Sequence, residues 1–396
     1  MSLPNPIQRL SSAPDVLSIE WADGQVSEYA SLWLRDNLPE DRDPHSGQRL
    51  VDIADLPLRP KIRRASSKHD TLQVEWENEA RVGTFRLDWL AAQATRRQPT
   101  RPERIRRRWL EGACLDPHHD FAWAALSEIR TAAWVRAAWL TRLLQDGIAF
   151  LSDVPCEEDA LLEAMTMVGR VAETNYGEVF DVRSVPRPEN LAYSDLGLGL
   201  HTDNPYREPV PGFQALHALV TSDEGGESLF ADGFAIAEHL RRSDPEGFAQ
   251  LTATAVPFHY RSAGADLYAE RPLIQLACDG EISAVHYNSR SIAPLKLAVR
   301  DAERFYAAYR GLAALLRLPR FQLQYRLHDG DLVVFDNQRT LHGRTGFSSA
   351  RYPRHLRGCY LTRDSVYCMT ALLRRESDQS SGACGVGADR TAAPCR

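Results

Sequence analysis

From residue 210 onward the sequence is a succession of short strand-like segments separated by turns, and this pattern limits the possible folds. The segments are FQALHALVT, ESLFADGF, AVPFHYRS, LIQLAC, ISAVHYN, FQLQYRLHDGDLVVFDN and RHLRGCYLTRD. Two stretches with helical spacing, residues 234–252 and 299–316, interrupt them. Many short strands with Gly and Pro turns are typical of a β-sandwich or jelly roll. We therefore expect a mainly β fold with flanking helices.

The same reasoning predicts how the chain is divided into domains. Residues 1–98 contain the alternating segments VLSIEWADG and TLQVEWENEARVGTFRLDWL, which predict a small β-rich N-terminal domain. We expect no internal repeat in the chain. Residues 99–120 are rich in Pro and Arg, and we expect a linker whose basic run, residues 101–108, is solvated. The second domain is expected at residues 121–375, followed by a polar, disordered tail at residues 376–396.

The start of the second domain carries a helical pattern. AWVRAAWLTRLLQDG predicts a helix that ends at Gly147, a residue suited to a C-cap. IAFLSDVP then predicts a strand, and EEDALLEAMTMVGRV predicts a second helix. Helices of this kind would flank the jelly roll.

Composition excludes several classes of partner. The net charge of −6 provides no basic surface, so we expect no nucleic-acid partner. No apolar run is long enough to span a bilayer, and the first fifteen residues lack the apolar core of a signal peptide. The seven cysteines include no CxxC, which favours reduced thiols in a cytoplasm and argues against a cysteine-built zinc site.

One metal-binding constellation stands out in GLHTDNPYREPVPG and DLVVFDNQRTLHGRTGF. His201 and Asp203 lie two residues apart, so in an extended segment they share one face. His342 follows a buried-looking strand and a turn, DNQR, that we expect to be exposed. An HxD pair alone is usually a coincidence. Two imidazoles and one carboxylate, however, form the facial triad of non-haem Fe(II) oxygenases, which leaves positions open for a co-substrate and O₂.

An arginine follows the third predicted metal ligand in the sequence. Arg354 is twelve residues after His342 and is expected on a returning strand. A 2-oxo acid that chelates iron needs its remote carboxylate held, and arginine can do this bidentately. An arginine on a strand is otherwise usually solvated.

At this point the residues resemble a known family, the γ-butyrobetaine dioxygenase group of Fe(II)/2-oxoglutarate oxygenases. The resemblance runs from about residue 15 to residue 370 and rests on SLWLRDN, GQRLVDIADLP, NYGEVFDVRS, NLAYSDLGLGLHTDNPYREPVPGFQALHAL, GGESLFADGF, DNQRTLHGR and RHLRGCY. It implies a catalytic domain that is a double-stranded β-helix, a jelly-roll variant. It also implies that His201, Asp203 and His342 bind Fe(II), and that Arg354, helped by Ser228, anchors 2-oxoglutarate.

The sequence departs from the family in its N-terminal domain. Family members commonly hold a structural zinc with three cysteines and a later histidine. Here Leu38, Glu40 and Asp43 stand where the cysteines are expected, and Arg81 stands near the histidine position. Thiolates are what select zinc at such sites. We therefore expect no structural zinc, and we expect His45 to be an ordinary loop residue.

The resemblance also implies a substrate pocket for a trimethylammonium group. A quaternary ammonium ion has no N–H to donate, so aromatic faces must bind it. The family's aromatic positions fall on Tyr176, Phe180, Tyr193 and Tyr360. Each of these residues taken alone would more often be a core aromatic.

The anionic end of the substrate is implied by other positions. Asn190 and Asn288 match residues that hold a carboxylate in the family. Asn204, Tyr206 and Arg290 add donors, and a phosphonate, with three oxygens and nearly two charges, needs more donors than a carboxylate. These residues resemble a bacterial branch of the group that acts on 2-(trimethylammonio)ethylphosphonate. The alternative is that Arg290 points to solvent or pairs with an acidic neighbour.

Together these features predict a dioxygenase that uses Fe(II), 2-oxoglutarate and O₂. It would hydroxylate 2-(trimethylammonio)ethylphosphonate to the 1-hydroxy product and release succinate and CO₂. The alternatives are hydroxylation of γ-butyrobetaine to carnitine, action on another betaine, or a module that senses betaines without turnover. By resemblance we expect a homodimer, with a small zwitterion as the only other partner.

Overall fold

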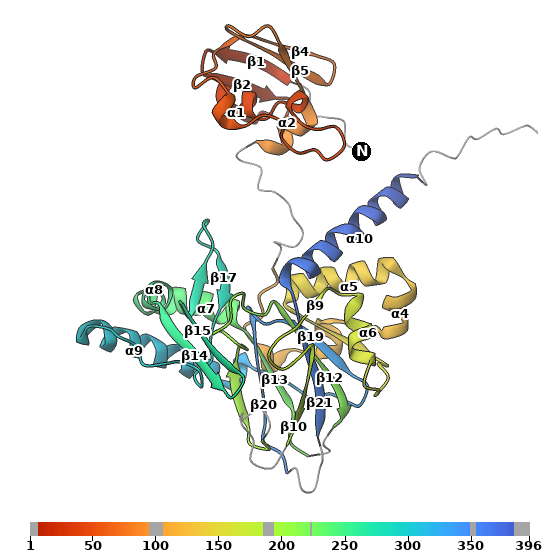
Figure 1. The fold of residues 1–396 in the computed structure, drawn as a ribbon, viewed down its shortest axis with the longest axis vertical. Coiled ribbons are helices and arrows are strands. Elements are labelled where there is room, and N and C mark those ends of the chain that lie inside the picture. Colours follow the sequence, from red (N-terminus) through yellow and green to blue (C-terminus); the bar gives the residue numbers. More distant parts are fainter. Residues whose placement is uncertain (1–6, 95–105, 185–193, 222–223, 349–353, 384–396) are drawn as a thin grey trace, which may run out of the picture. The chain divides into compact units, whose positions relative to one another are not determined.

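The alternating sequence patterns form β-sheets in both units of the chain, residues 1–101 and residues 102–396 (Figure 1). Each unit is described by itself. The structure is a computed structural model, and it describes residues 7–94, 106–184, 194–221, 224–348 and 354–383, with side chains as far as residue 377.

The smaller unit repeats one arrangement twice, namely three antiparallel strands followed by a short helix. The first copy is β1 (Ile7–Ala13), β2 (Val16–Trp21), β3 (Val26–Ala30) and α1 (Ser31–Asp36), and the second is β4 (Ile62–Lys68), β5 (Thr71–Trp76), β6 (Val82–Arg86) and α2 (Leu87–Gln93). In both β2 and β5 every second residue is buried, which leaves Trp21 and Trp76 at matching core positions. The expectation of no internal repeat was wrong, since VLSIEW in β2 and TLQVEW in β5 also share Leu, Glu and Trp at matching positions.

The positions where the family resemblance places zinc ligands make other contacts here. Leu38 is fully buried in the core, and Glu40 accepts a hydrogen bond from the backbone of β6. Arg35 and Arg81 each bind the carboxylate of Asp41 at 2.7 Å. Burial alone would raise the pKa of Asp41, but the hydrogen bonds from the two arginines lower it. An ion-pair cluster therefore joins the turn at residues 39–41 to the segment before β6.

The larger unit has two sheets, and the expectation of a mainly β jelly roll with flanking helices is confirmed. The larger sheet has the order β10-β21-β12-β19-β8-β7, with β9 beside β21, and the smaller sheet has the order β11-β20-β13-β18. The strands are β7 (Ala122–Ala125), β8 (Ile148–Ser152), β9 (Val171–Ala172), β10 (Val179–Arg183), β11 (Leu198–His201), β12 (Phe213–Val220), β13 (Ser228–Asp232), β18 (Leu323–Tyr325), β19 (Leu332–Asp336), β20 (Thr340–Arg344) and β21 (His355–Leu361).

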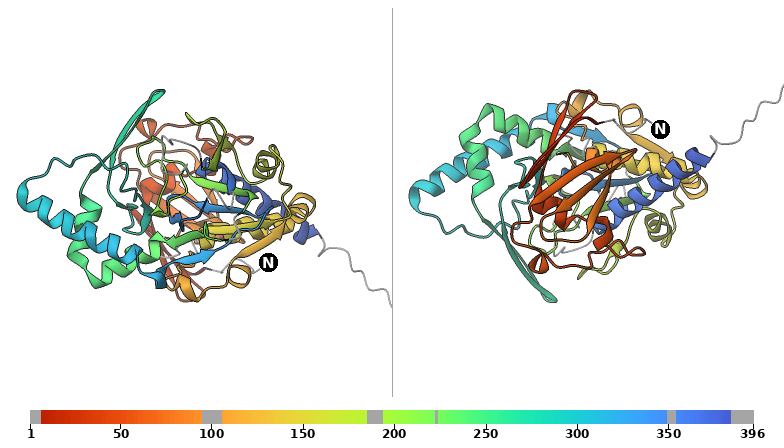
Figure 2. Two further views of the ribbon diagram at one scale, coloured as in Figure 1. Left: turned by 90° about the horizontal axis from the view of Figure 1, so that it is seen from below. Right: turned by 90° about the horizontal axis from the view of Figure 1, so that it is seen from above.

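Two hairpins and eight α-helices complete the described part of this unit. The hairpins are β14 (Val256–Ser262) with β15 (Ala265–Arg271), and β16 (Ile274–Leu276) with β17 (Ile282–Val285). The helices are α3 (Pro117–Asp120), α4 (Leu126–Thr131), α5 (Ala133–Asp146), α6 (Ala160–Thr166), α7 (Gly233–Ser243), α8 (Pro245–Ala253), α9 (Val299–Leu316) and α10 (Arg363–Ala383). Figure 2 shows α8 and α9 at one end of the unit and α10 at the other.

The two faces of the larger sheet belong to different cores. Phe150, Val333 and Phe335 face the smaller sheet and pack there with Phe230. The alternate residues, such as Val334 of β19, pack against the helices on the other side. A strand that is buried on both faces needs a continuous apolar run, which explains the sequence LVVF in β19.

Two predictions about the ends of this unit were wrong. Arg107, expected in a solvated linker, forms an ion pair with the buried Asp146 at 2.6 Å, and Trp109 is 4% exposed. Residues 106–109 therefore pack on the larger unit, because their basic and aromatic side chains find partners there. Helix α10 continues to Ala383, so residues 376–383 are helical and not disordered, while residues 384–396 lie outside the described residues.

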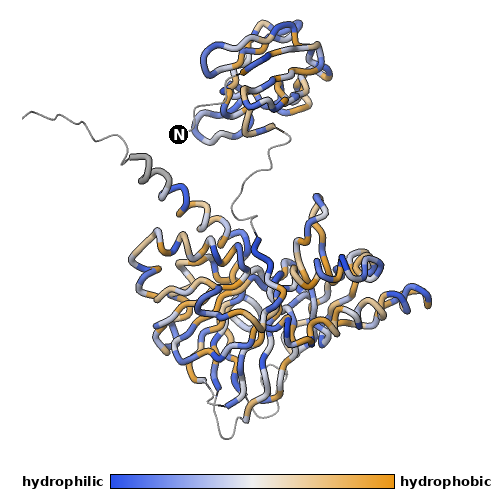
Figure 3. The backbone as a smooth tube through the Cα atoms, turned by 180° about the vertical axis from the view of Figure 1, so that it is seen from behind, coloured by the Kyte–Doolittle hydropathy of each residue, from blue (hydrophilic) through white to orange (hydrophobic). Residues whose placement is uncertain are grey.

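Apolar and polar residues alternate along the backbone of both units in Figure 3. Among the described helices, none combines the length and the apolar character that crossing a bilayer requires. The five described cysteines, Cys114, Cys156, Cys278, Cys359 and Cys368, are free thiols.

A buried ion pair provides the first testable prediction. Arg339 is 1% exposed and binds the fully buried Asp232 through Nη2 at 2.8 Å. Arg339→Ala leaves that carboxylate without its cation, so the free energy of unfolding in urea should fall by about 3–5 kcal/mol. The exposed Arg304 provides a matched control, and Arg304→Ala should change this free energy by less than about 0.5 kcal/mol. Equal losses in the two variants would contradict the prediction.

Candidate active site

The three side chains of the predicted metal site are brought together by strand pairing. β11 and β20 are antiparallel neighbours in which His201 lies opposite His342, and the centroids of their rings are 4.3 Å apart. Asp203 lies just beyond the end of β11. Its Oδ1 is 3.2 Å from Nε2 of His201, and its Oδ2 is 3.7 Å from Nε2 of His342. Among the described residues this is the one group of three that could hold a metal ion.

Asp203 is held by the turn between β19 and β20, which the sequence analysis expected to be exposed. Asn337 accepts from the backbone N–H of Asp203 at 2.7 Å and donates to its carbonyl at 3.0 Å. Asp336, Asn337 and Arg339 are all at least 95% buried, so the expectation of an exposed turn was wrong. These polar side chains can be buried because each forms hydrogen bonds or ion pairs within the protein. For Asn337 the hydrogen-bond partner is the backbone of Asp203.

Further hydrogen bonds orient the ligand atoms. Nδ1 of His201 lies 2.9 Å from the carbonyl of Gly199, which favours a proton on Nδ1 and a free lone pair on Nε2. The hydroxyl of Tyr360 donates to Oδ2 of Asp203 at 2.9 Å. Tyr360 therefore fixes the rotation of the carboxylate. Nδ1 of His342 is buried and has no hydrogen-bond partner among the described residues.

The electrostatics of the site suit a divalent cation. Burial and the nearby His201 lower the pKa of His342 to about 3, so this imidazole is neutral at physiological pH. Burial would raise the pKa of Asp203, but contacts with its neighbours, among them the hydrogen bond from the hydroxyl of Tyr360, lower it. Metal ligands must be deprotonated imidazoles and carboxylates. Two imidazoles and one carboxylate are the donor set of a mononuclear Fe(II) site with open positions.

A cavity of about 460 Å³ opens beside the three ligands. Every described residue that the sequence analysis assigned to the site lines this cavity, namely Tyr176, Phe180, His201, Asp203, Asn204, Tyr206, Ser228, Asn288, Arg290, His342, Arg354 and Tyr360. Asn190 and Tyr193 lie outside the described residues. Other lining residues, including Gln214, Tyr260, Ser291 and Arg344, were not predicted from the sequence.

Two arginines form one basic part of the cavity wall. Arg354 is 8% exposed, and burial together with the neighbouring Arg344 lowers its pKa to about 10, which leaves it charged at neutral pH. Its Nε donates to the carbonyl of Gly226 at 3.0 Å, while its two terminal nitrogens have no hydrogen bond to another described residue. Ser228 of β13 pairs with Arg344 of β20. This wall could hold the remote carboxylate of a dicarboxylic co-substrate.

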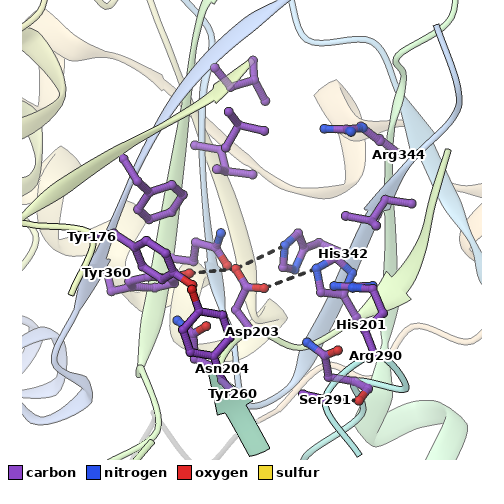
Figure 4. A pocket seen from close by; sticks show the side chains of 18 of the residues that line it. Tyr176, His201, Asp203, Asn204, Tyr260, Arg290, Ser291, His342, Arg344 and Tyr360 are labelled. Carbon is purple, nitrogen blue, oxygen red and sulfur yellow. Dashed lines mark hydrogen bonds and ion pairs between the residues drawn. The ribbon is translucent and has the colours of Figure 1, made fainter. Parts of the chain in front are cut away.

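Aromatic rings gather on the other side of the ligands, as Figure 4 shows for Tyr176, Tyr260 and Tyr360. The centroids of Phe180 and Tyr360 are 5.0 Å apart. Tyr206 stacks on Tyr260 at 5.1 Å with an interplanar angle of 16°. The sequence analysis assigned Tyr206 to the anionic end of the substrate. The structure places it in this aromatic cluster, because its ring packs on a tyrosine of β14.

Polar groups lie away from most of this cluster, and Figure 4 shows Arg290 and Ser291 on the same side of Asp203 as the histidines. Arg290 lines the cavity and forms neither an ion pair nor a hydrogen bond with another described residue. Arg290 is an exposed residue that reaches the cavity from the solvent side, so part of the alternative that it points to solvent holds. Desolvation by the surrounding residues lowers the pKa of its guanidinium, and Asp203 and Tyr206 oppose that shift. Asn288 donates from Nδ2 to the carbonyl of Thr202 at 3.1 Å. Asn204 instead accepts from the hydroxyl of Tyr206 at 2.6 Å, on the aromatic side.

Comparison with known proteins agrees with this geometry. Residues 117–360 match the family described as "Taurine catabolism dioxygenase TauD, TfdA family", and residues 8–91 match "Gamma-butyrobetaine hydroxylase-like, N-terminal". A γ-butyrobetaine dioxygenase from Pseudomonas sp. (strain AK-1) is 34% identical over 380 residues, which cover 94% of this chain and 97% of that protein. A trimethyllysine dioxygenase from Meyerozyma guilliermondii is 26% identical, with 93% and 96% covered.

Among solved structures, an asparagine oxygenase in complex with Fe(II), hydroxyasparagine and succinate is 21% identical, with 60% of this chain and 83% of that chain covered and a TM-score of 0.49. The ligand triad and the sequence matches together define an Fe(II)- and 2-oxoglutarate-dependent dioxygenase, which uses O₂ as a co-substrate. The chain belongs to the TauD, TfdA family of dioxygenases and carries a γ-butyrobetaine hydroxylase-like N-terminal domain.

The hydrogen bond between Tyr360 and Asp203 leads to a prediction about metal affinity. Tyr360→Phe keeps the ring and removes the donor, so the carboxylate loses an orienting contact. Groups that orient metal ligands typically contribute a factor of 10–100 in affinity, and we expect the dissociation constant of Mn(II), a paramagnetic substitute for Fe(II), to rise about tenfold. Electron paramagnetic resonance of free Mn(II) measures this. In Tyr260→Phe the constant should stay within about twofold of the wild type, because this hydroxyl has no bond to a ligand. Unchanged affinity in Tyr360→Phe would refute the prediction.

Proposed function

We propose that this dioxygenase hydroxylates 2-(trimethylammonio)ethylphosphonate at the carbon next to phosphorus and releases succinate and CO₂. The observation that carries the proposal is the position of Arg290. This cation lines the cavity without a hydrogen bond or ion pair to another described residue, and in Figure 4 Asp203 lies between it and Tyr176 and Tyr360. A zwitterion with one cationic end and one anionic end would fit between the two sides.

The protein's contribution to the reaction is binding and orientation. Tyr176, Phe180 and Tyr360 offer ring faces to the ammonium group, which cannot donate a hydrogen bond. Arg290 and Asn288 would bind the phosphonate oxygens. Holding both ends places the C–H bond between them beside His201 and Asp203, where Fe(II) with 2-oxoglutarate supplies the oxidising chemistry when bound. Arg354 and Ser228 would anchor the co-substrate's remote carboxylate.

Hydroxylation of γ-butyrobetaine to carnitine is the second candidate. It is favoured by the relative of that name, which is 34% identical across 97% of its length. A carboxylate has two oxygens and one charge and can be bound by amide donors such as that of Asn288. The two candidates differ in what they require of Arg290, because a phosphonate brings a third oxygen and close to a second charge.

We also propose, from the family resemblance alone, that the enzyme is a cytoplasmic homodimer. Sedimentation equilibrium of the full chain would give the mass of two chains if this is right.

The two substrates can be separated by a variant at Arg290. With wild type, kcat/KM should be higher for the phosphonate than for γ-butyrobetaine. Arg290→Ala should lower kcat/KM for the phosphonate about 10–100-fold, since a hydrogen bond to a charged group is typically worth about 1.5–3 kcal/mol. The loss for γ-butyrobetaine should stay below about fivefold. Product formation by NMR and succinate release measure both reactions.

Arg261 provides a matched control for this comparison. It also lines the cavity, but its charge is paired with Asp266 at 3.0 Å. Arg261→Ala should change the ratio of the two kcat/KM values less than about twofold. Equal losses on both substrates in Arg290→Ala would count against the phosphonate and leave γ-butyrobetaine as the better candidate.

A further inference from the structure

The aromatic cluster contains one ring that comes from outside the jelly roll. Tyr260 lies on β14, whose hairpin with β15 forms a separate two-stranded sheet. Its ring stacks on Tyr206 and meets Tyr176 edge-on, with centroids 6.2 Å apart. None of the family-implied aromatic positions falls on this hairpin. Tyr260 therefore adds a face to the cluster that sequence comparison did not assign.

β14 is joined by backbone contacts to the segment that carries Arg290. The N–H of His259 donates to the carbonyl of Ser291 at 2.8 Å, and the N–H of Ala293 donates to that of Pro257 at 2.9 Å. Between them, Phe258 and Ile292 form a β-bridge. These two hydrogen bonds are the ones that define the bridge, and they fix residues 291–293 to the edge of the hairpin. Phe258, two residues before Tyr260 on the same face, is fully buried and anchors the strand.

The same segment is fixed to the metal ligands at its other end. The N–H of Thr202 donates to the carbonyl of Tyr287 at 2.7 Å, and the N–H of Tyr287 donates to Oγ1 of Thr202 at 3.0 Å. A turn comes next, closed by the N–H of Ser291 donating to the carbonyl of Asn288 at 3.1 Å, and Arg290 lies within this turn. Thr202 lies between His201 and Asp203. Its hydrogen bonds to Tyr287 therefore fix the position of the turn that carries Arg290 relative to the metal ligands.

We propose that β14 and residues 287–293 act as one rigid element that selects the length of the substrate. This element, called the gauge here, carries Tyr260 at the aromatic side and Arg290 at the polar side of the cavity. Because the gauge fixes the separation of the two, a zwitterion that is one methylene too long or too short cannot bind both. Tyr260 is then a specificity-determining residue. The inference rests on the proposed function in one respect, namely that the substrate is a trimethylammonium zwitterion.

The wild-type enzyme should discriminate between substrates that differ in length by one methylene. A pocket that must accommodate one extra or one missing methylene typically discriminates by about 10–200-fold. We expect kcat/KM to fall by such a factor when the two-methylene phosphonate is replaced by the one-methylene or three-methylene homologue. The same pattern, with its own optimum, should hold for a parallel series of trimethylammonio carboxylates.

Substitutions at Tyr260 test the role of the gauge. Tyr260→Leu keeps apolar bulk and removes the aromatic face, so the cationic end loses its contact with the gauge. The KM of the preferred substrate should rise about 3–30-fold, the range expected for a cation–π contact, and the preference for one length should shrink below about threefold. Tyr260→Phe keeps the face and should retain the preference.

Tyr268 provides the matched control, because it lies on β15 of the same hairpin and is 55% exposed. Tyr268→Ala should leave the length preference at its wild-type value. The inference is overturned if Tyr260→Leu, folded by circular dichroism, keeps the wild-type preference, or if Tyr268→Ala loses it equally. In both cases normal wild-type turnover would leave the proposed function standing. If the wild type turns over no trimethylammonium substrate, the proposed function fails and the inference fails with it.

Discussion

The pairing of β11 with β20 is the constraint on which the active site depends. Because side chains alternate between the faces of a strand, a shift of one residue would turn one imidazole away from the other. β11 has only four residues and an irregular register between Leu198 and His201, so the strand alone fixes little. Two contacts just beyond the strand support the register. Asn337 forms two hydrogen bonds with the backbone of Asp203, and Thr202 forms two hydrogen bonds with Tyr287.

Features that depend on local periodicity or on one residue's backbone preference could be predicted from the sequence. Helix α9 spans the expected residues 299–316, and Gly147 ends α5 with a φ of 77°, as its lack of a Cβ allows. The strand LVVF was recognised because both of its faces are buried. His342 was predicted as the third ligand because it follows a buried-looking strand and a turn, and the family resemblance then supported this choice, since spacing alone cannot say which distant strand lies beside β11.

Features that depend on long-range partners could not be predicted. The turn containing Asn337 and Arg339 is polar in sequence, yet it is buried because its partners, Asp203 and Asp232, come from other strands. Tyr260 reads as an ordinary alternating strand residue, and only the fold shows that β14 borders the cavity. The repeat in the smaller unit, by contrast, leaves a trace in the sequence, because VLSIEW and TLQVEW share Leu, Glu and Trp at matching positions. Most other residues of the two copies differ, and their common order of three strands and a helix is seen only in the structure.

The charges around the cavity bear on the choice of substrate. Among the described residues that line it, Arg290, Arg344 and Arg354 are cations and Asp203 is the one carboxylate, while Arg261 is paired with Asp266 and burial keeps His342 neutral. A divalent metal ion would add positive charge, and a dianionic co-substrate beside Arg354 would offset that addition. Arg290 would remain as a cation facing the substrate. A phosphonate, with close to two charges and three acceptor oxygens, can form a stronger ion pair with Arg290 than a carboxylate does and keeps an oxygen for a second donor, which is the physical argument for a phosphonate at this end.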